Sequence, residues 1–257
     1  MSEADVLGHH RAGSGPRRVI VLNDWMCDTS TWDGARAYLD GEIFSWAFTD
    51  LRGYGRSRGR DGAFTALEAA TDVLALADSL GWARFAIVGH SMSTLVALHL
   101  AQHHADRIER AVLLTPAPPA GFGADNARLE GTRTVARGDD AMRMAVLIER
   151  FGDRLSKGWA TYKAARWRAG ADPEAAAAYA AMFMRDGVPD PTARIAVPVL
   201  AITGEQDAPG MRRDAVVRSL SPLCDRLEVI ALADSGHYPM QEMPPLTVAL
   251  VERFLAS

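Results

Sequence analysis

The sequence FAIVGHSMS occupies residues 85–93. Its first four residues are an apolar run typical of a buried strand, and helix-forming residues follow at 94–101. A sharp strand-to-helix turn between them would hold Ser91 in a strained conformation, with its hydroxyl projecting from the sheet. Such a turn needs small neighbours, which Gly89 and Ser93 provide, although Ser93 stands where glycine is more usual. The stretch therefore predicts a nucleophile elbow centred on Ser91, and an ordinary turn with a serine cap is the alternative.

Short apolar runs recur along the chain and are typical of strands buried on both faces of a parallel sheet. They cover residues 19–22, 45–49, 85–88, 111–114, 199–203 and 227–232. Helical patterns lie between them, which implies right-handed crossovers. The sequence therefore predicts an α/β fold with a mostly parallel, doubly wound sheet.

Two of the helical patterns carry a clear apolar stripe. Residues 64–80 have apolar side chains at three- and four-residue spacing before Gly81 closes the helix, and residues 245–256 have them at four-residue spacing. We expect both stripes to be buried. Their members are Leu67, Ala70, Leu74, Ala77 and Leu80 in the first helix and Leu246, Leu250 and Phe254 in the second.

The alternation of strands and helices stops between residues 121 and 195, where the chain is rich in Ala, Arg, Met and Trp. Asp172, followed by Pro173, is a strong helix start, and that helix should end before Gly187. We expect a single domain with a core of residues 1–120 and 196–257 and an inserted helical cap of residues 121–195. Such a cap belongs over the carboxyl edge of the sheet, where open α/β sheets bind ligands.

The chain has 257 residues, of which 48% are hydrophobic and 23% charged, and its net charge is −4. A chain of this size buries a large core without disulfides, so Cys27 and Cys224 are expected as free thiols. Nothing in the charge pattern favours nucleic acid or a membrane surface as a partner, and no apolar run is long enough to span a membrane. Residues 1–16 lack the apolar centre of a secretory signal. We therefore expect a cytoplasmic protein that binds a small molecule, with its oligomeric state left open.

An elbow serine needs a base and an acid that orients the base, and they follow it in the chain order serine, acid, histidine. His237 lies in the loop after the last apolar run and is the candidate base. Asp207 lies in the loop after the preceding run and is the candidate acid, in competition with Glu205 and Asp234. We prefer Asp207, because Asp234 is too close in sequence to His237 to orient its ring easily.

Together these features resemble the α/β-hydrolase fold superfamily, in its serine-nucleophile branch with a helical cap. Besides the elbow, residues 204–207 and 236–237 match that pattern, and DLRGYGRS at residues 50–57 is similar to the loop after its fourth strand. The resemblance implies eight strands, one of them antiparallel near the start, and we expect the first strand to be missing or reduced because the N-terminal segment is short. It also implies an oxyanion hole of two backbone N–H groups, which fall on Trp25 and Met92.

The loop that carries Trp25 departs from the family pattern. Asn23 and Asp24 stand where His-Gly is usual. A carboxylate pointing into the site would oppose a developing oxyanion. We therefore expect Asn23 and Asp24 to turn outward and to hydrogen-bond the local backbone, as such residues do in tight loops. The alternative is that Asp24 is an acid that contacts the substrate.

With Ser91 as nucleophile, His237 as base and Asp207 as the orienting acid, the resemblance implies a serine hydrolase that works through an acyl-enzyme. We expect its substrate to be a small apolar or aromatic ester, lactone or thioester, bound between the sheet and the cap. The residues expected to line the pocket are Asp24, Met26, Trp159, Tyr162, Trp167, Met182 and Phe183.

Three other functions stay open on the same fold. Carbon–carbon bond hydrolases and cofactor-free dioxygenases share it, and the altered loop at residues 23–24 is compatible with both; a non-enzymatic small-molecule receptor is the third, although such proteins usually have a damaged triad. No metal or cofactor is expected. His99 and His103 have the spacing of a zinc-binding helix, but they lack the glutamate between them and a third ligand.

Overall fold

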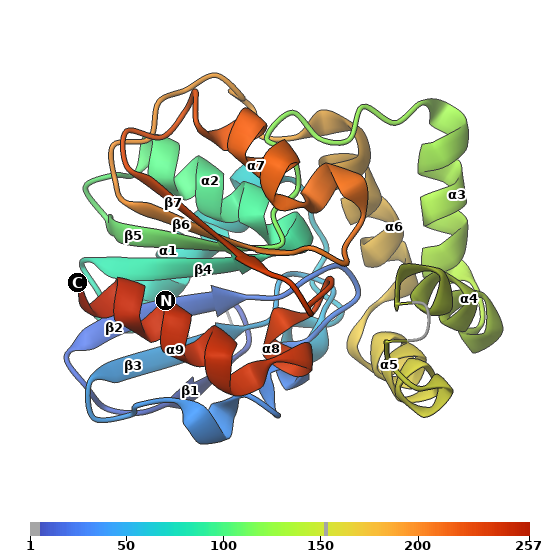
Figure 1. The fold of residues 1–257 in the computed structure, drawn as a ribbon, viewed down its shortest axis with the longest axis horizontal. Coiled ribbons are helices and arrows are strands. Elements are labelled where there is room, and N and C mark those ends of the chain that lie inside the picture. The colour runs from blue at the N-terminus through green and yellow to red at the C-terminus, as the bar shows by residue number, and fades with distance from the viewer. Residues whose placement is uncertain (1–5, 152–153) are drawn as a thin grey trace.

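The computed structural model of the chain describes residues 6–151 and 154–257. Within them the chain forms a seven-stranded sheet of order β1-β3-β2-β4-β5-β6-β7, in which only β1 is antiparallel to its neighbour (Figure 1). The strands are β1 (His9–Ala12), β2 (Arg17–Leu22), β3 (Phe44–Thr49), β4 (Phe85–His90), β5 (Ile108–Leu114), β6 (Val199–Gly204) and β7 (Leu227–Leu232). The predicted α/β fold with a mostly parallel sheet is confirmed, with seven strands in place of eight.

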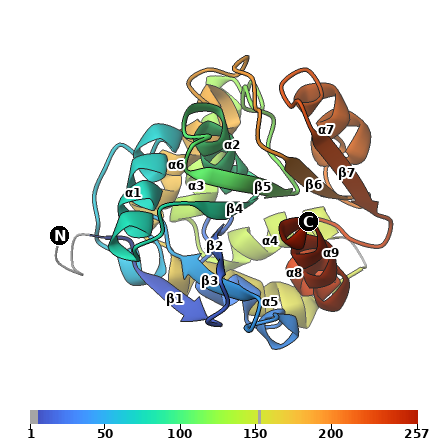
Figure 2. The same cartoon turned by 90° about the vertical axis from the view of Figure 1, so that its left-hand side faces the viewer.

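Helices cover both faces of the sheet, with α1, α2 and α7 on one side and α9 on the other (Figure 2). They span α1 (Ala66–Ser79), α2 (Thr94–His103), α7 (Arg213–Leu220) and α9 (Pro244–Ala256). Short helical segments are η2 (Thr29–Trp32), η3 (Arg36–Tyr38), η4 (Gly55–Ser57), η5 (Ser91–Ser93), η7 (Pro209–Met211) and α8 (Pro239–Glu242).

The buried faces of α1 and α9 differ from the expected stripes. Leu67 is 54% exposed and Leu246 is 42% exposed, so neither belongs to the core. The core-facing side of α1 is instead lined mainly by small side chains, which allow the helix to pack closely. Its buried members are Ala66, Ala69, Ala70, Val73, Leu76 and Ala77.

The segment between β5 and β6 is helical and lies beyond the carboxyl ends of the parallel strands, to the right of the sheet in Figure 1. Its elements are α3 (Asn126–Arg137), α4 (Asp140–Phe151), α5 (Lys157–Gly170), α6 (Pro173–Ala181) and the π-helical turn η6 (Met182–Asp186). As expected from the sequence, Asp172 caps α6 through the Glu174 and Ala175 N–H groups, and the helical run ends at Gly187, whose φ is 65°. We refer to α3–η6 as the cap.

The sheet is buried so that polar side chains gather only where strands end. Every residue of β3, β4 and β6 is buried, and the loops after β2, β4, β6 and β7 all reach the edge that faces the cap. Among the described residues no helix combines the length and the apolar character that crossing a membrane requires.

Candidate active site

The turn after β4 has the strained geometry of a nucleophile elbow. Ser91 has φ 53°, in the left-handed region that a residue with a side chain rarely adopts. At Gly89, an added Cβ would lie 2.7 Å from the backbone oxygen of Ser93 and 2.9 Å from Cα of Thr94, so only glycine fits. Met92 follows Ser91 in the first turn of η5, where backbone N–H groups have no partner inside the helix.

Ser93, which replaces the usual glycine, closes the elbow with its side chain. Its hydroxyl accepts a hydrogen bond from the His90 N–H at 2.9 Å and donates one to the His90 backbone oxygen at 3.0 Å. The departure from the family pattern thus supplies two hydrogen bonds across the turn, and the small side chain is fully buried without a clash.

The structure brings Asp207 and His237 together. Nδ1 of His237 lies 2.7 Å from Oδ2 of Asp207, and both side chains are 3% exposed. Asp234 is exposed, and Glu205 accepts a hydrogen bond from the Arg213 N–H, so neither competitor is placed to orient the ring. Because Nδ1 donates to a carboxylate, Nε2 is the nitrogen left to face the pocket.

The expectation that Asn23 and Asp24 turn outward is wrong. Both are 2% exposed, and the Asn23 amide donates to the Thr49 backbone oxygen at the end of β3. Oδ2 of Asp24 lies 3.3 Å from Nε2 of His237, the nitrogen that an elbow serine would use. The imidazole of His237 therefore has a carboxylate on each side, and Ser91 makes no hydrogen bond to it among the described contacts.

Two donors hold the Asp24 carboxylate in this position. Its own neighbour Trp25 donates its backbone N–H to Oδ1 at 2.5 Å, and the hydroxyl of Tyr238 donates to Oδ2 at 3.0 Å. The physical reason for the inward orientation is this pair of donors together with the charge of His237. The N–H that was expected to serve as an oxyanion donor thus already has an acceptor.

The charges of the site depend on one another. Burial alone would lower the pKa of His237, but the Asp207 and Asp24 carboxylates outweigh it and raise that pKa to about 9. Burial alone would raise the pKa of Asp24 and of Asp207, but His237 holds both below the usual range. The two carboxylates on either side of the ring therefore favour the protonated form of the His237 imidazole.

His90, the residue before the elbow serine, ties the elbow to the base. Its Nε2 lies 2.7 Å from the backbone oxygen of His237, which also accepts from the hydroxyl of Thr115 at 3.2 Å. Burial lowers the pKa of His90 to about 4, so the ring is neutral and Nε2 carries the proton. The sequence left His90 unassigned, and nothing in its local pattern indicates a partner 147 residues away.

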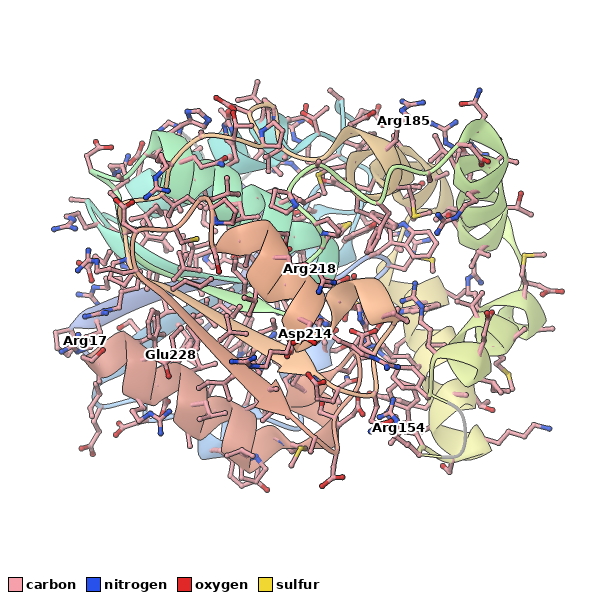
Figure 3. The ribbon with its side chains drawn as sticks, turned by 45° about the horizontal axis from the view of Figure 1, so that its top comes forward. Arg17, Arg154, Arg185, Asp214, Arg218 and Glu228 are labelled. Atoms are coloured by element: carbon pink, nitrogen blue, oxygen red, sulfur yellow. The ribbon has the colours of Figure 1, made fainter. Side chains whose placement is uncertain are left out.

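Two contacts join the cap to the loop that carries His237. Arg154, labelled in Figure 3 at the junction of cap and core, pairs with Glu242, whose carboxylate accepts the N–H groups of Gly236 at 2.8 Å and Tyr238 at 2.9 Å. Lys163 of α5 is 2% exposed, and its Nζ lies 4.0 Å from the centre of the Tyr238 ring. The backbone on both sides of His237 is therefore held by one buried carboxylate.

A pocket of about 220 Å³ opens beside Ser91 and His237. Of the residues expected to line it, Asp24 and Phe183 do so. Its other cap-side and loop residues were not predicted from the sequence. These are Phe122, Arg128, Thr132, Arg150, Met184, Ala208 and Met211.

Five expected lining residues do not line this pocket in the described part of the chain. Tyr162 is 51% exposed, and Met26, Trp167 and Met182 are buried in packing; the Trp167 ring meets the edge of Trp25. Trp159 packs on Phe151 and Tyr238. Most aromatic and methionine side chains of the cap lie in its interior, because their apolar surface is buried against other side chains and does not face the pocket.

One group of described side chains could converge on a cation. Asp24, His90 and His237 each offer a ligand atom, and these atoms lie within 4.8 Å of one another. A cation there would compete with the proton that the two carboxylates hold on His237, since a metal binds only neutral imidazole. The donor set therefore suits a proton better than a metal.

Comparison with known proteins agrees with the fold. The model of the alpha/beta hydrolase family matches residues 19–250. The chain is similar to the enol-lactonase from Burkholderia xenovorans, with 30% identity over 98% of this chain and 96% of that one and a TM-score of 0.82. The fold is also that of an esterase from Exiguobacterium antarcticum, with a TM-score of 0.84 at 17% identity over 97% of this chain and 95% of the other.

A shorter match joins the chain to curated sequences. Over 107 residues, or 41% of its length, this chain is 33% identical to a pimeloyl-[acyl-carrier protein] methyl ester esterase from Salmonella heidelberg. The chain matches only 39% of the length of that relative.

Proposed function

Within the alpha/beta hydrolase family, to which this chain belongs, we propose that the protein hydrolyses a carboxylic ester, lactone or thioester of a small molecule. Ser91 is the nucleophile, His237 the base and Asp207 the group that orients the base. The observation that carries the proposal is the 2.7 Å contact between Asp207 and His237 beside a serine held at φ 53° in the same pocket.

The reaction follows from these positions. Ser91 Oγ attacks the substrate carbonyl while Nε2 of His237 takes the hydroxyl proton, and the carboxylate of Asp207 stabilises the imidazolium that forms. The Met92 N–H stabilises the oxyanion, and His237 returns the proton to the leaving oxygen or sulfur. Water, activated by the same histidine, then releases the acid from the acyl-enzyme.

Asp24 sets a condition on this chemistry. Its Oδ1 occupies the Trp25 N–H in the resting site, so that N–H joins the oxyanion hole only when the carboxylate turns aside. Its Oδ2 stands beside Nε2 of His237, which must be free to reach Ser91. In the proposed reaction, a bound substrate therefore displaces the carboxylate before the serine attacks.

A fluorophosphonate probe tests the proposal without knowledge of the natural substrate. It attaches only to an activated serine, so mass mapping should place the label on Ser91 in the wild type. His237→Ala should abolish labelling while the variant stays folded. Absence of label on Ser91, or labelling at wild-type rate in His237→Ala, would contradict the serine mechanism.

The position of Asp24 favours a second candidate, in which His237 acts as base on the substrate itself, as in carbon–carbon bond hydrolysis or cofactor-free oxygenation. A carboxylate at the oxyanion position suits proton transfer better than ester cleavage. Asp24→Gly separates the two candidates. The ester proposal expects the wild type to hydrolyse a neutral ester and Asp24→Gly, which frees the Trp25 N–H and Nε2 of His237, to hydrolyse it as fast or faster, whereas ester hydrolysis that appears only in Asp24→Gly supports the second candidate.

A further inference from the structure

Two arginines from the cap line the candidate active site. Arg128 lies in the first turn of α3 and Arg150 in the last turn of α4, and both line the pocket that contains Ser91 and His237. The hydroxyl-bearing Thr132, one turn after Arg128, lines it as well. The cap thus presents cationic and hydroxyl donors to a site whose reacting groups lie on the sheet side.

These two arginines differ from the others of the cap. Each of the others between α3 and η6 has an acidic partner, namely Glu130 for Arg133, Glu174 for Arg137, Asp140 for Arg143 and Arg168, Glu242 for Arg154, Asp28 for Arg166 and Asp186 for Arg185. Within residues 6–151 and 154–257, the guanidinium groups of Arg128 and Arg150 have no acidic partner and no hydrogen bond. Among the described residues, the arginines of the cap that have no acidic partner are therefore the two at the pocket.

The carboxylates of the site do not satisfy these arginines. Asp24 and Asp207 are 2% and 4% exposed, and both are paired with His237. His237 is the main cause of the lowered pKa of both carboxyls, and the charge of Arg150, which lines the same pocket, adds to it. Because both carboxylates are paired with His237, the guanidinium groups of Arg128 and Arg150 are left for a ligand, and an anion is the ligand that pairs with them.

We propose that Arg128 and Arg150 bind a carboxylate carried by the substrate, so that the enzyme acts on esters or lactones of carboxylate-bearing acids. Planar guanidinium groups match a carboxylate in charge and in hydrogen-bond geometry. In this binding mode the carboxylate lies at the cap wall and the reacting carbonyl at Ser91, and Phe122 and Phe183 supply apolar lining of the same pocket. This assignment of substrate class rests on the proposed hydrolase function.

Three methyl esters of equal chain length separate charge from shape. They are monomethyl glutarate, its terminal amide methyl 5-amino-5-oxopentanoate, and methyl pentanoate. We expect the wild type to show a KM at least tenfold lower for the glutarate than for the other two, with release of acid followed in a pH-stat. The double variant Arg128→Gln/Arg150→Gln should lose this preference, because its KM for the glutarate should rise at least about tenfold, to the range of the KM for methyl pentanoate.

Arg185→Gln is the matched control. This arginine also belongs to the cap, but it lies on its outer surface, where it pairs with the adjacent Asp186 (Figure 3). The control should keep the glutarate preference, and the wild-type preference should weaken as salt concentration rises. An unchanged preference in the double variant, or a wild type that favours methyl pentanoate, would overturn the proposal.

Binding without turnover distinguishes the failure of this proposal from failure of the hydrolase function. In Ser91→Ala, monomethyl glutarate should raise Tm and methyl pentanoate at the same concentration should not. The added changes Arg128→Gln/Arg150→Gln should remove the shift. If the shift appears and no ester is hydrolysed by the wild type, the carboxylate site stands and the hydrolase function fails; if esters are hydrolysed and the shift is absent, the carboxylate site fails.

Discussion

The two walls of the pocket are built differently. On the sheet wall, Asp24, Asp207 and His237 are buried, and each has charged or hydrogen-bonded partners from distant parts of the chain. On the cap wall, Arg128 and Arg150 are exposed and have no partner among the described residues. A side chain that protein partners hold in place is suited to act on the reacting bond. An arginine without a protein partner is suited to bind a charged group of the ligand. Changes on the sheet wall should therefore appear in kcat and changes on the cap wall in KM.

The largest effect on the sheet wall is expected for the nucleophile. Ser91→Ala removes the atom that forms the acyl-enzyme, so kcat for ester hydrolysis should fall at least about 10³-fold with Tm nearly unchanged. Ser79→Ala, at the far end of α1, is a control that should retain full activity. Turnover near the wild-type rate in Ser91→Ala would exclude the acyl-enzyme route.

The next effect concerns the acid. Asp207→Asn keeps the shape but lets the ring of His237 adopt the wrong tautomer, so kcat should fall about 10²- to 10⁴-fold. Asp234→Asn is the matched control, because Asp234 is close to His237 in sequence yet exposed. A crippling effect of Asp234→Asn together with a mild effect of Asp207→Asn would reverse the assignment of the acid.

The pH dependence of kcat/KM measures how much the two carboxylates raise the pKa of His237. An ordinary histidine titrates near 6.5, but His237 has its pKa raised to about 9, so kcat/KM should rise with pH toward a midpoint near 9. Asp24→Asn removes one negative charge beside the imidazolium and should lower that midpoint by roughly one unit. A midpoint near 6.5 in the wild type, or one that Asp24→Asn leaves in place, would show that Asp24 does not face the ring.

The same shift affects folding. A histidine whose pKa is higher in the folded than in the unfolded state stabilises the protein fully below pH 6.5, and this contribution is lost as pH rises through about 9.

The smallest effect is expected where the loop of His237 is held rather than where it reacts. Glu242→Gln replaces an acceptor of two N–H groups by a side chain with a single acceptor oxygen, so the free energy of unfolding should fall by about 1–3 kcal/mol. Urea unfolding measures it. Glu228 is an exposed residue of β7 and is labelled in Figure 3, and Glu228→Gln should stay within about 0.5 kcal/mol of the wild type. Equal losses in both variants would mean that Glu242 does not hold the loop.

The two walls also differ in how well the sequence predicts them. The strands on which the sheet wall is built are apolar on both faces, so the predicted run at residues 199–203 and the observed β6 (Val199–Gly204) differ by one residue. The direction of Asp24 could not be predicted, because Tyr238 and His237, which determine it, are more than 200 residues away. Local rules for Asx residues favour an outward turn, and tertiary contacts override them.

On the cap wall the sequence predicts the helices but not the faces that meet the pocket. Trp167 and Met182 are apolar and were predicted to line the pocket, yet both are buried among other side chains. Arg128 and Arg150 resemble any other arginine of this arginine-rich segment, and what distinguishes them is that they line the pocket and have no acidic partner among the described residues.

The ring of Tyr238 links cap and chemistry in a further way. Its face meets the ammonium of Lys163 from α5, and its hydroxyl donates to Asp24. Movement of α5 away from the core would separate the buried ammonium of Lys163 from the ring of Tyr238. The energetic cost of this separation makes α5 the anchored end of the cap. When a bound substrate displaces the Asp24 carboxylate, the phenol loses this acceptor, which alters the polarity of its ring and with it the attraction for Lys163. The strength of the contact that holds α5 of the cap to Tyr238 therefore depends on the stage of the reaction.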